Sequence, residues 1–126
     1  MLSDPQILEN HAECIEEVMR YIRTHIGDPL DRETLAAVAG FSVPHFHRVF
    51  TMHVGESAIS YVRRLRLERA ARKLRMGAVD ITEVALAAGY DTHAAFGKAF
   101  KQQFGLSPRE FRQLDCWVAT KLLTKG

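Results

Sequence analysis

Residues 35–57 read LAAVAGFSVPHFHRVFTMHVGES, and a loosely similar stretch, VALAAGYDTHAAFGKAFKQQFGLS, follows at residues 84–107. The two copies are offset by 49 positions before the turn and by 50 after it, so the second copy has one more turn residue. The matching pairs are Gly40 with Gly89, Phe41 with Tyr90, Phe46 with Phe96, Arg48 with Lys98, Phe50 with Phe100, Gly55 with Gly105 and Ser57 with Ser107. Each copy predicts a short alanine-rich helix, a turn that contains glycine and a longer amphipathic helix.

This order of elements is the helix-turn-helix pattern. Small side chains such as Ala36 and Ala39 would let the second helix cross close to the first, and the glycine opens the turn at low steric cost. A helical hairpin that only stabilises a bundle has the same pattern, so one copy alone would leave both interpretations open. Two copies at this spacing favour DNA binding.

The rest of the chain has helical apolar spacing as well. Ile15, Val18 and Ile22 predict one face of a first helix, and a long helix is expected from about Glu56 to Met76. Further helix starts are indicated by Asp31 as an N-cap, by Asp80 with Glu83 as a capping box, and by Ser107-Pro108-Arg109-Glu110. No alternating β-branched run predicts a strand. We therefore expect an all-α fold of about seven helices.

The helix boundaries divide the chain into three parts. Residues 1–55 are expected to form an N-terminal helix-turn-helix subdomain, residues 56–76 a connecting helix, and residues 77–126 a C-terminal helix-turn-helix subdomain. A connecting helix of about 20 residues would be roughly 30 Å long. Successive major-groove entries on one DNA face lie about 34 Å apart. One chain could then present two recognition helices, the second helix of each unit, to adjacent major-groove segments.

The charge is distributed unevenly along the chain. Residues 1–34 hold three basic and eight acidic side chains, whereas the whole chain has a net charge of +2. The connecting helix is rich in cations, namely Arg63, Arg64, Arg66, Arg69, Arg72, Lys73 and Arg75. A basic body fits an anionic partner such as DNA, although a solvated face has the same composition. An architectural or adaptor protein that binds DNA without sequence preference is the corresponding alternative.

Other classes of protein find no support in the sequence. There is no Gly-rich phosphate loop, no zinc-binding spacing and no nucleophile with its base, so we expect neither an enzyme nor a cofactor. Cys14 and Cys116 form no disulfide framework or metal motif, which predicts a reduced, cytoplasmic setting. No signal peptide or membrane span is expected. His45 and His47 are two positions apart and point in different directions on a helix, which is not the spacing of a helical metal site.

The aromatic and histidine side chains also have expected places. His11, His25 and His53 are expected to be solvated, and Trp117 is expected to pack a C-terminal tail onto the domain. The phenylalanines at helical spacing are expected in the core rather than on a base-stacking surface, namely Phe46, Phe50, Phe96, Phe100, Phe104 and Phe111.

The motif IxxVAxxxGY, followed by FxxAFKxxFGxSPxxFR, runs from Ile81 to Arg112. It resembles the DNA-binding domain of the AraC/XylS family of transcription regulators, and the resemblance extends over about residues 15–114. The segments FHRVF and YVRRLRLERAARKL are similar to a subgroup that often carries a GyrI-like effector-binding domain. The chain ends at Gly126, so that effector domain is expected to be absent from it.

The resemblance implies a sequence-specific regulator that binds double-stranded DNA at promoter sites, acts as an activator and has RNA polymerase as a candidate partner. It also implies that the first half of each recognition helix enters the major groove. The candidate DNA-binding residues are Pro44, His45, His47, Arg48, His93, Ala94, Gly97, Lys98 and Lys101. Arg48 could form a bidentate contact with guanine, while Ala94 and Gly97 have no side-chain donor or acceptor for a base edge. Specificity is therefore expected to lie mostly in the first unit, with Lys98 and Lys101 contacting phosphates.

Overall fold

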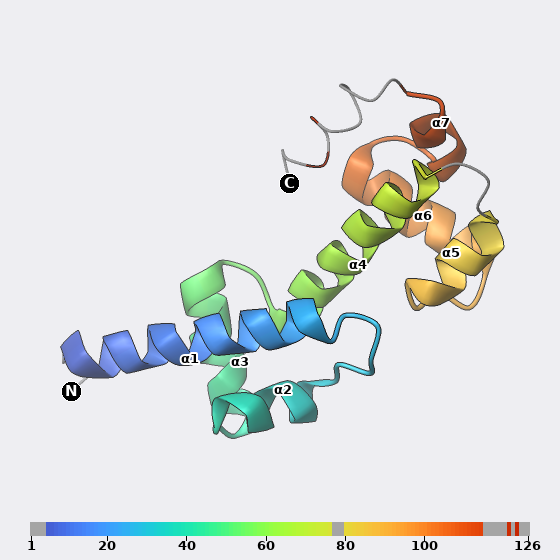
Figure 1. Ribbon diagram of the computed structural model, residues 1–126. Helices are drawn as coiled ribbons and strands as arrows, with labels where there is room; N and C mark the ends of the chain where they lie inside the picture. Colours follow the sequence, from blue (N-terminus) through green and yellow to red (C-terminus); the bar gives the residue numbers. More distant parts are fainter. Residues whose placement is uncertain (1–4, 77–79, 115–120, 122, 124–126) are drawn as a thin grey trace. The chain divides into compact units, whose positions relative to one another are not determined.

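The computed structural model describes residues 5–76, 80–114, 121 and 123, and these residues form helices joined by turns, with no strand among them. The helices are α1 (Pro5–Thr24), α2 (Arg32–Ala39), α3 (Val43–Val54), α4 (Ala58–Leu74), α5 (Ile81–Ala87), α6 (His93–Phe104) and α7 (Pro108–Arg112) (Figure 1). The prediction of an all-α fold of two helix-turn-helix units is confirmed. The expectations for Cys116 and Trp117 lie outside the described residues.

The chain divides into two compact units within α4, between Arg63 and Arg64. The connecting helix is shorter than the sequence indicates, because α4 has 17 residues and is therefore about 26 Å long. Its start is set by Ser57, whose hydroxyl oxygen accepts a hydrogen bond from the backbone N–H of Ser60 at 3.1 Å. This cap leaves Glu56 in the turn before the helix.

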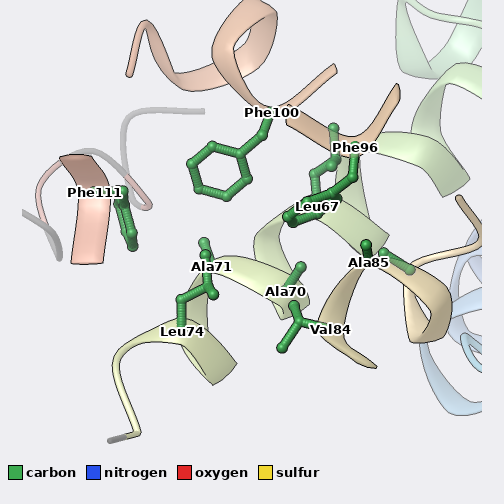
Figure 2. Packing of buried hydrophobic residues seen from close by; sticks show 10 residues of the cluster. Leu67, Ala70, Ala71, Leu74, Val84, Ala85, Phe96, Phe100 and Phe111 are labelled. Carbon is green, nitrogen blue, oxygen red and sulfur yellow. The ribbon is translucent and has the colours of Figure 1, made fainter. Parts of the chain in front are cut away.

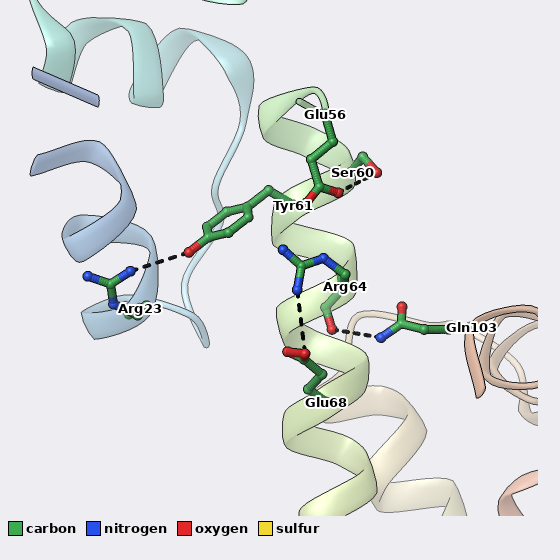
Figure 3. Close-up of polar contacts among 7 residues, drawn as sticks. All are labelled: Arg23, Glu56, Ser60, Tyr61, Arg64, Glu68 and Gln103. Carbon is green, nitrogen blue, oxygen red and sulfur yellow. Dashed lines mark hydrogen bonds and ion pairs between the residues drawn. The ribbon is translucent and has the colours of Figure 1, made fainter. Parts of the chain in front are cut away.

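The first unit is built on one apolar face of α1. Ile15, Val18 and Ile22 are buried there, as the spacing predicts. They share the interior of the unit with side chains from α2, α3 and the start of α4, among them Leu35, Phe46, Phe50 and Tyr61. Tyr61 also accepts a hydrogen bond from α1, because Arg23 Nη1 donates to its hydroxyl oxygen at 3.3 Å (Figure 3).

The second unit has a core in which α4 supplies one wall and aromatic rings the other. Leu67, Ala70, Ala71 and Leu74 of α4 face Val84 and Ala85 of α5 and the rings of Phe96, Phe100 and Phe111 (Figure 2). Phe46, Phe50, Phe96, Phe100 and Phe111 are all buried as predicted, and Phe104 is half-buried against this cluster. These rings are the structural core and are not available for stacking on bases.

Polar contacts hold α6 and α7 of the second unit against α4. Gln103 Nε2 donates to the carbonyl oxygen of Arg64 at 3.2 Å, and the Arg64 side chain pairs with the buried Glu68 at 3.5 Å (Figure 3). At the other end of α4, Arg75 Nη1 donates to the carbonyl oxygens of Arg112 at 3.1 Å and Phe111 at 3.4 Å. The same guanidinium contacts the Leu114 carbonyl. Arg75 thus caps the C-terminal end of α7, where a helix leaves carbonyls without partners.

The predicted helix starts are correct in position. Asp31 Oδ1 accepts from the N–H of Thr34 at 2.8 Å, and Ser107 with Glu110 forms a complete capping box. Hydrogen bonding by Thr34 lowers the pKa of Asp31, and the backbone and hydroxyl of Ser107 lower that of Glu110. Asp80 departs from the prediction, because it accepts from the N–H of Thr82 at 3.0 Å and caps α5 alone.

Two histidines expected to be solvated are instead packed against rings of the first unit. The ring of His25 stacks on that of Tyr21, with centroids 4.0 Å apart, and its Nδ1 lies 3.0 Å from the Tyr21 carbonyl oxygen. The ring of His11 meets Phe41 edge-on at 5.5 Å. The expectation was therefore wrong for both residues. His25 lies one helical turn after Tyr21 and His11 lies across from Phe41, so an aromatic ring shields each imidazole. His53 is exposed as expected.

Candidate nucleic-acid interface

The turns of the two helix-turn-helix units are closed in the same way. In the first, the N–H of Phe41 donates to the carbonyl of Ala36 at 3.0 Å, and in the second, the N–H of Tyr90 donates to that of Ala85 at 3.0 Å. Gly40 and Gly89, with φ of 76° and 93°, adopt the left-handed conformation that ends a helix in this manner. The internal repeat seen in the sequence is therefore a repeat of backbone geometry.

The extra turn residue of the second unit is taken up before the recognition helix. In the first unit the N-cap of α3 is Ser42, which accepts from the N–H of His45 at 3.4 Å. In the second unit the N-cap of α6 is Thr92, which accepts from the N–H of Ala95 at 3.0 Å. Ser42 comes two residues after its glycine and Thr92 three, so each recognition helix starts from a capped, ordered turn.

The outer face of α3 carries three of the predicted contact residues. Pro44, His47 and Arg48 are exposed and recur at positions i, i+3 and i+4, so they lie on one side of the helix. Phe46, Val49 and Phe50 point into the core of the first unit. This arrangement places one guanidinium and one imidazole side by side on an otherwise uncovered helical face.

His45 has different surroundings from the other three candidates on α3. It is half-buried, and its ring lies 4.6 Å from that of Phe41, with an angle of 28° between the planes. The ring of His11 contacts it edge-on at 5.7 Å. Its packing against two rings makes His45 a residue that positions the start of α3.

The face of α6 that points away from the core carries fewer functional groups. His93, Ala94, Lys98 and Lys101 are exposed, while Phe96 and Phe100 are buried. Gly97 is half-buried in the middle of the helix, and a Cβ atom built there would have no neighbour within 4 Å. The two lysines are the charged groups of this face, and the packing of the described residues leaves room for a side chain at position 97.

Two exposed positions on these helices were not predicted from the sequence to be contact residues. Met52, one turn after Arg48, is 66% exposed, and Gln102 on α6 is exposed as well. They are equivalent in the internal repeat, since they are 50 positions apart. Their equivalence in the repeat could have indicated that both positions are exposed. The sequence instead suggests a core position for Met52, because it is an apolar residue in an amphipathic helix.

The comparisons with known proteins agree with this geometry. Residues 35–114 match a family model described as "Helix-turn-helix domain". The chain is 33% identical over 110 residues to the transcriptional regulator Rob of Salmonella typhimurium. The aligned residues make up 87% of this chain and 38% of that protein. It thus spans well under half the length of this curated relative.

Solved structures give the same result. The DNA-binding domain of the global transcriptional factor AdpA, determined in complex with a target DNA, is 31% identical, with a TM-score of 0.71 and coverage of 78% of this chain and 88% of that one. A probable AraC family transcriptional regulator from Rhodopseudomonas palustris is 28% identical, with a TM-score of 0.73 and coverage of 80% and 95%. The chain belongs to the AraC family of helix-turn-helix, DNA-binding transcription regulators.

Within residues 5–76 and 80–114, no helix is both long and apolar enough to cross a membrane.

Proposed function

We propose that this chain binds specific double-stranded DNA sites at promoters by inserting α3 and α6 into adjacent major-groove segments, and that it activates transcription. The observation that carries the proposal is the exposed group of Pro44, His47 and Arg48 on one face of α3, with Ala94, Gly97 and Lys98 at the equivalent positions of α6. Both faces begin at a capped helix start that follows the same closed turn.

The face of α3 has the chemistry to read bases. The planar guanidinium of Arg48 matches O6 and N7 of guanine in a bidentate contact. The imidazole of His47 can donate or accept a hydrogen bond at a base edge. Pro44 has no donor and can offer only apolar contact, for example to a thymine methyl group. The first unit therefore carries most of the base readout.

The face of α6 is suited to the DNA backbone. Lys98 and Lys101 supply point charges for phosphates, which add affinity without sequence preference. Gly97 costs about 1 kcal/mol relative to alanine in a helix. Because a Cβ at Gly97 would meet no atom of the described residues within 4 Å outside its own helix backbone, their packing does not call for this glycine. A close approach of the α6 backbone to the DNA would require a glycine at this position.

Several finer points rest on the family resemblance. RNA polymerase is the proposed partner in activation, and the cytoplasm is the proposed location. The similarity of residues 46–50 and 61–74 to the subgroup with a GyrI-like effector-binding domain also stays a prediction.

The alternative is an architectural protein that uses the basic side chains of α4 on any duplex. The two functions differ in the ratio of specific to nonspecific affinity at physiological salt. Fluorescence anisotropy with a selected duplex and a scrambled duplex of equal length measures this ratio. A regulator should give about 10³ or more. A ratio near one, with strong salt dependence, would leave the architectural function.

A further inference from the structure

The outer face of α3 continues for one helical turn beyond Arg48. Met52 is 66% exposed and follows Arg48 by four positions, just as Arg48 follows Pro44. At roughly 100° per residue, Pro44 and Met52 lie about 40° to either side of Arg48 around the helix axis. The buried rings of Phe46 and Phe50 are on the opposite side. Pro44, Arg48 and Met52 therefore form one exposed row.

Met52 differs from the other exposed apolar side chains in its position. In the described part of the chain, Met76 and Leu86 are comparably exposed, and both lie outside α3 and α6. A single exposed apolar side chain is common on protein surfaces, so exposure alone does not define a contact. Met52, however, lies in the row that holds the proposed base contact Arg48, and its function is to be sought there.

The direction and chemistry of Met52 suit a contact beside Arg48. A helical side chain leans toward the N-terminus of its helix and covers the turn before its own Cα, so Met52 extends back toward the turn of Arg48. Its unbranched side chain and polarizable thioether adapt to an irregular apolar surface. The row thus has an apolar group at each end and a guanidinium in the middle.

The major groove offers a matching apolar group, the C5-methyl of thymine. Phosphates are contacted through hydrogen-bond donors, which a thioether does not have, so Met52 cannot bind the DNA backbone in the way a lysine does. Four helical residues rise about 6 Å and one base pair rises about 3.4 Å. A methyl group within reach of Met52 therefore lies about two base pairs from the guanine that Arg48 contacts.

We propose that Met52 is a specificity-determining residue that contacts the C5-methyl group of a thymine about two base pairs from the guanine bound by Arg48. This inference rests on the proposed function, since it requires α3 to lie in the major groove. It assigns Pro44 and Met52 to thymines on opposite sides of that guanine. Gln102, the equivalent of Met52 in the internal repeat, has an amide in place of the thioether, so the second unit lacks this apolar contact.

The experiment uses the full chain and a duplex obtained by selection from random DNA. Each thymine is replaced singly by deoxyuridine, which removes the methyl group and leaves the base pair intact. Fluorescence anisotropy gives the affinities of the wild type, Met52→Ala and Met52→Leu. The matched control is His53→Ala, because His53 is exposed at the same end of α3 but lies outside the row. Urea denaturation of each variant shows that it is folded.

One uracil substitution, about two base pairs from the position at which Arg48→Ala loses its preference, should weaken wild-type binding about fourfold. Met52→Ala should bind the thymine duplex more weakly by a similar factor and should be insensitive to that substitution. Met52→Leu and His53→Ala should remain sensitive to it. A uracil substitution on the other side of the guanine should weaken the wild type and Met52→Ala equally, because Pro44 is unchanged in both.

The proposal is wrong if Met52→Ala is as sensitive as the wild type to every uracil substitution. A selected motif without thymine within about three base pairs of the position read by Arg48 would overturn it as well. Equal wild-type affinity for selected and scrambled duplexes would instead refute the proposed function, and this proposal with it. Specific binding without a uracil effect that depends on Met52 refutes this proposal alone.

Discussion

The ring of His45 stacks on the ring of Phe41, with centroids 4.6 Å apart. Phe41 is the first residue after the glycine that ends α2, and His45 is in the first turn of α3. The contact therefore joins the turn to the first turn of the first recognition helix. It also leaves His45 half-buried, whereas Pro44, His47 and Arg48 are exposed.

His45→Ala is expected to lower the stability of the protein by about 0.5–1.5 kcal/mol, the usual value of an aromatic pair. The affinity for DNA should fall by a similar factor on all sequences, because the variant loosens α3 rather than a base contact. Urea denaturation and anisotropy on matched and mismatched duplexes measure both effects. His47→Ala, on the exposed face, is the control, and it should change base preference with little effect on stability. If His45→Ala changed the base preference and His47→Ala lowered the stability, His45 would be the residue that contacts a base.

Arg48→Ala is expected to cost about 1–3 kcal/mol on the specific site and to relax the preference at one base pair. Its counterpart in the second unit, Lys98→Ala, should weaken all duplexes about equally and reduce the salt dependence by about one unit of slope. Binding titrations at several salt concentrations separate the two. If Arg48→Ala weakens every duplex to the same degree, Arg48 is a phosphate contact.

Gly97→Ala is expected to stabilise the protein by about 1 kcal/mol, since it removes a glycine from a helix and its Cβ meets nothing within 4 Å. If the α6 backbone lies against DNA, the same variant should bind the specific duplex more weakly. Thermal melting and anisotropy give the two numbers. A stabilised variant with unchanged DNA affinity would show that α6 keeps its backbone away from the DNA.

Phe100→Ala is expected to destabilise the protein by about 3–5 kcal/mol, because the ring is fully buried among Phe96, Phe104 and Phe111. Leu86→Ala, at a side chain that is 58% exposed, should change the stability by at most about 0.5 kcal/mol. Denaturant unfolding monitored by circular dichroism tests the pair. Similar losses in the two variants would contradict the packing of the second unit.

The helix caps predict a pH dependence of stability. Hydrogen bonds to Thr34 and to Ser107 lower the pKa values of Asp31 and Glu110 in the folded chain. The unfolded chain then binds more protons at low pH, so the stabilisation is present above the ordinary carboxyl pKa of roughly 4 and is lost as the pH falls through the folded values. Asp31→Asn/Glu110→Gln should therefore be less stable than the wild type at pH 7. The difference should shrink when urea unfolding is repeated below about pH 4, and a constant difference would exclude the carboxylates as its cause.

Most of the fold could be predicted from local sequence signals. Gly40 and Gly89 marked the helix ends, Asp31 and Ser107 marked helix starts, and the repeat placed Arg48 and Lys98 at equivalent positions. These features depend on neighbours within a few residues, which a sequence displays directly. The start of α4 was placed at about Glu56, two residues before Ala58, because helical spacing continues through Glu56 while Ser57 caps the helix.

The surroundings of single side chains were harder to predict. The ring contacts of His11 with Phe41 and His45 join residues some 30 positions apart, and no periodicity encodes them. Tertiary packing decides such features, whereas the helical pattern records only which side of each helix faces inward.

In vitro selection from random duplex DNA at near-physiological salt tests whether this chain recognises a specific DNA sequence. We expect enrichment of one motif that spans about two adjacent major-groove segments. We also expect that a base-by-base scan of that motif will give the larger penalties in the half bound by α3. Equal penalties in both halves would contradict the unequal division of readout between α3 and α6. No enrichment, with binding that depends only on salt, would contradict sequence-specific recognition by this chain.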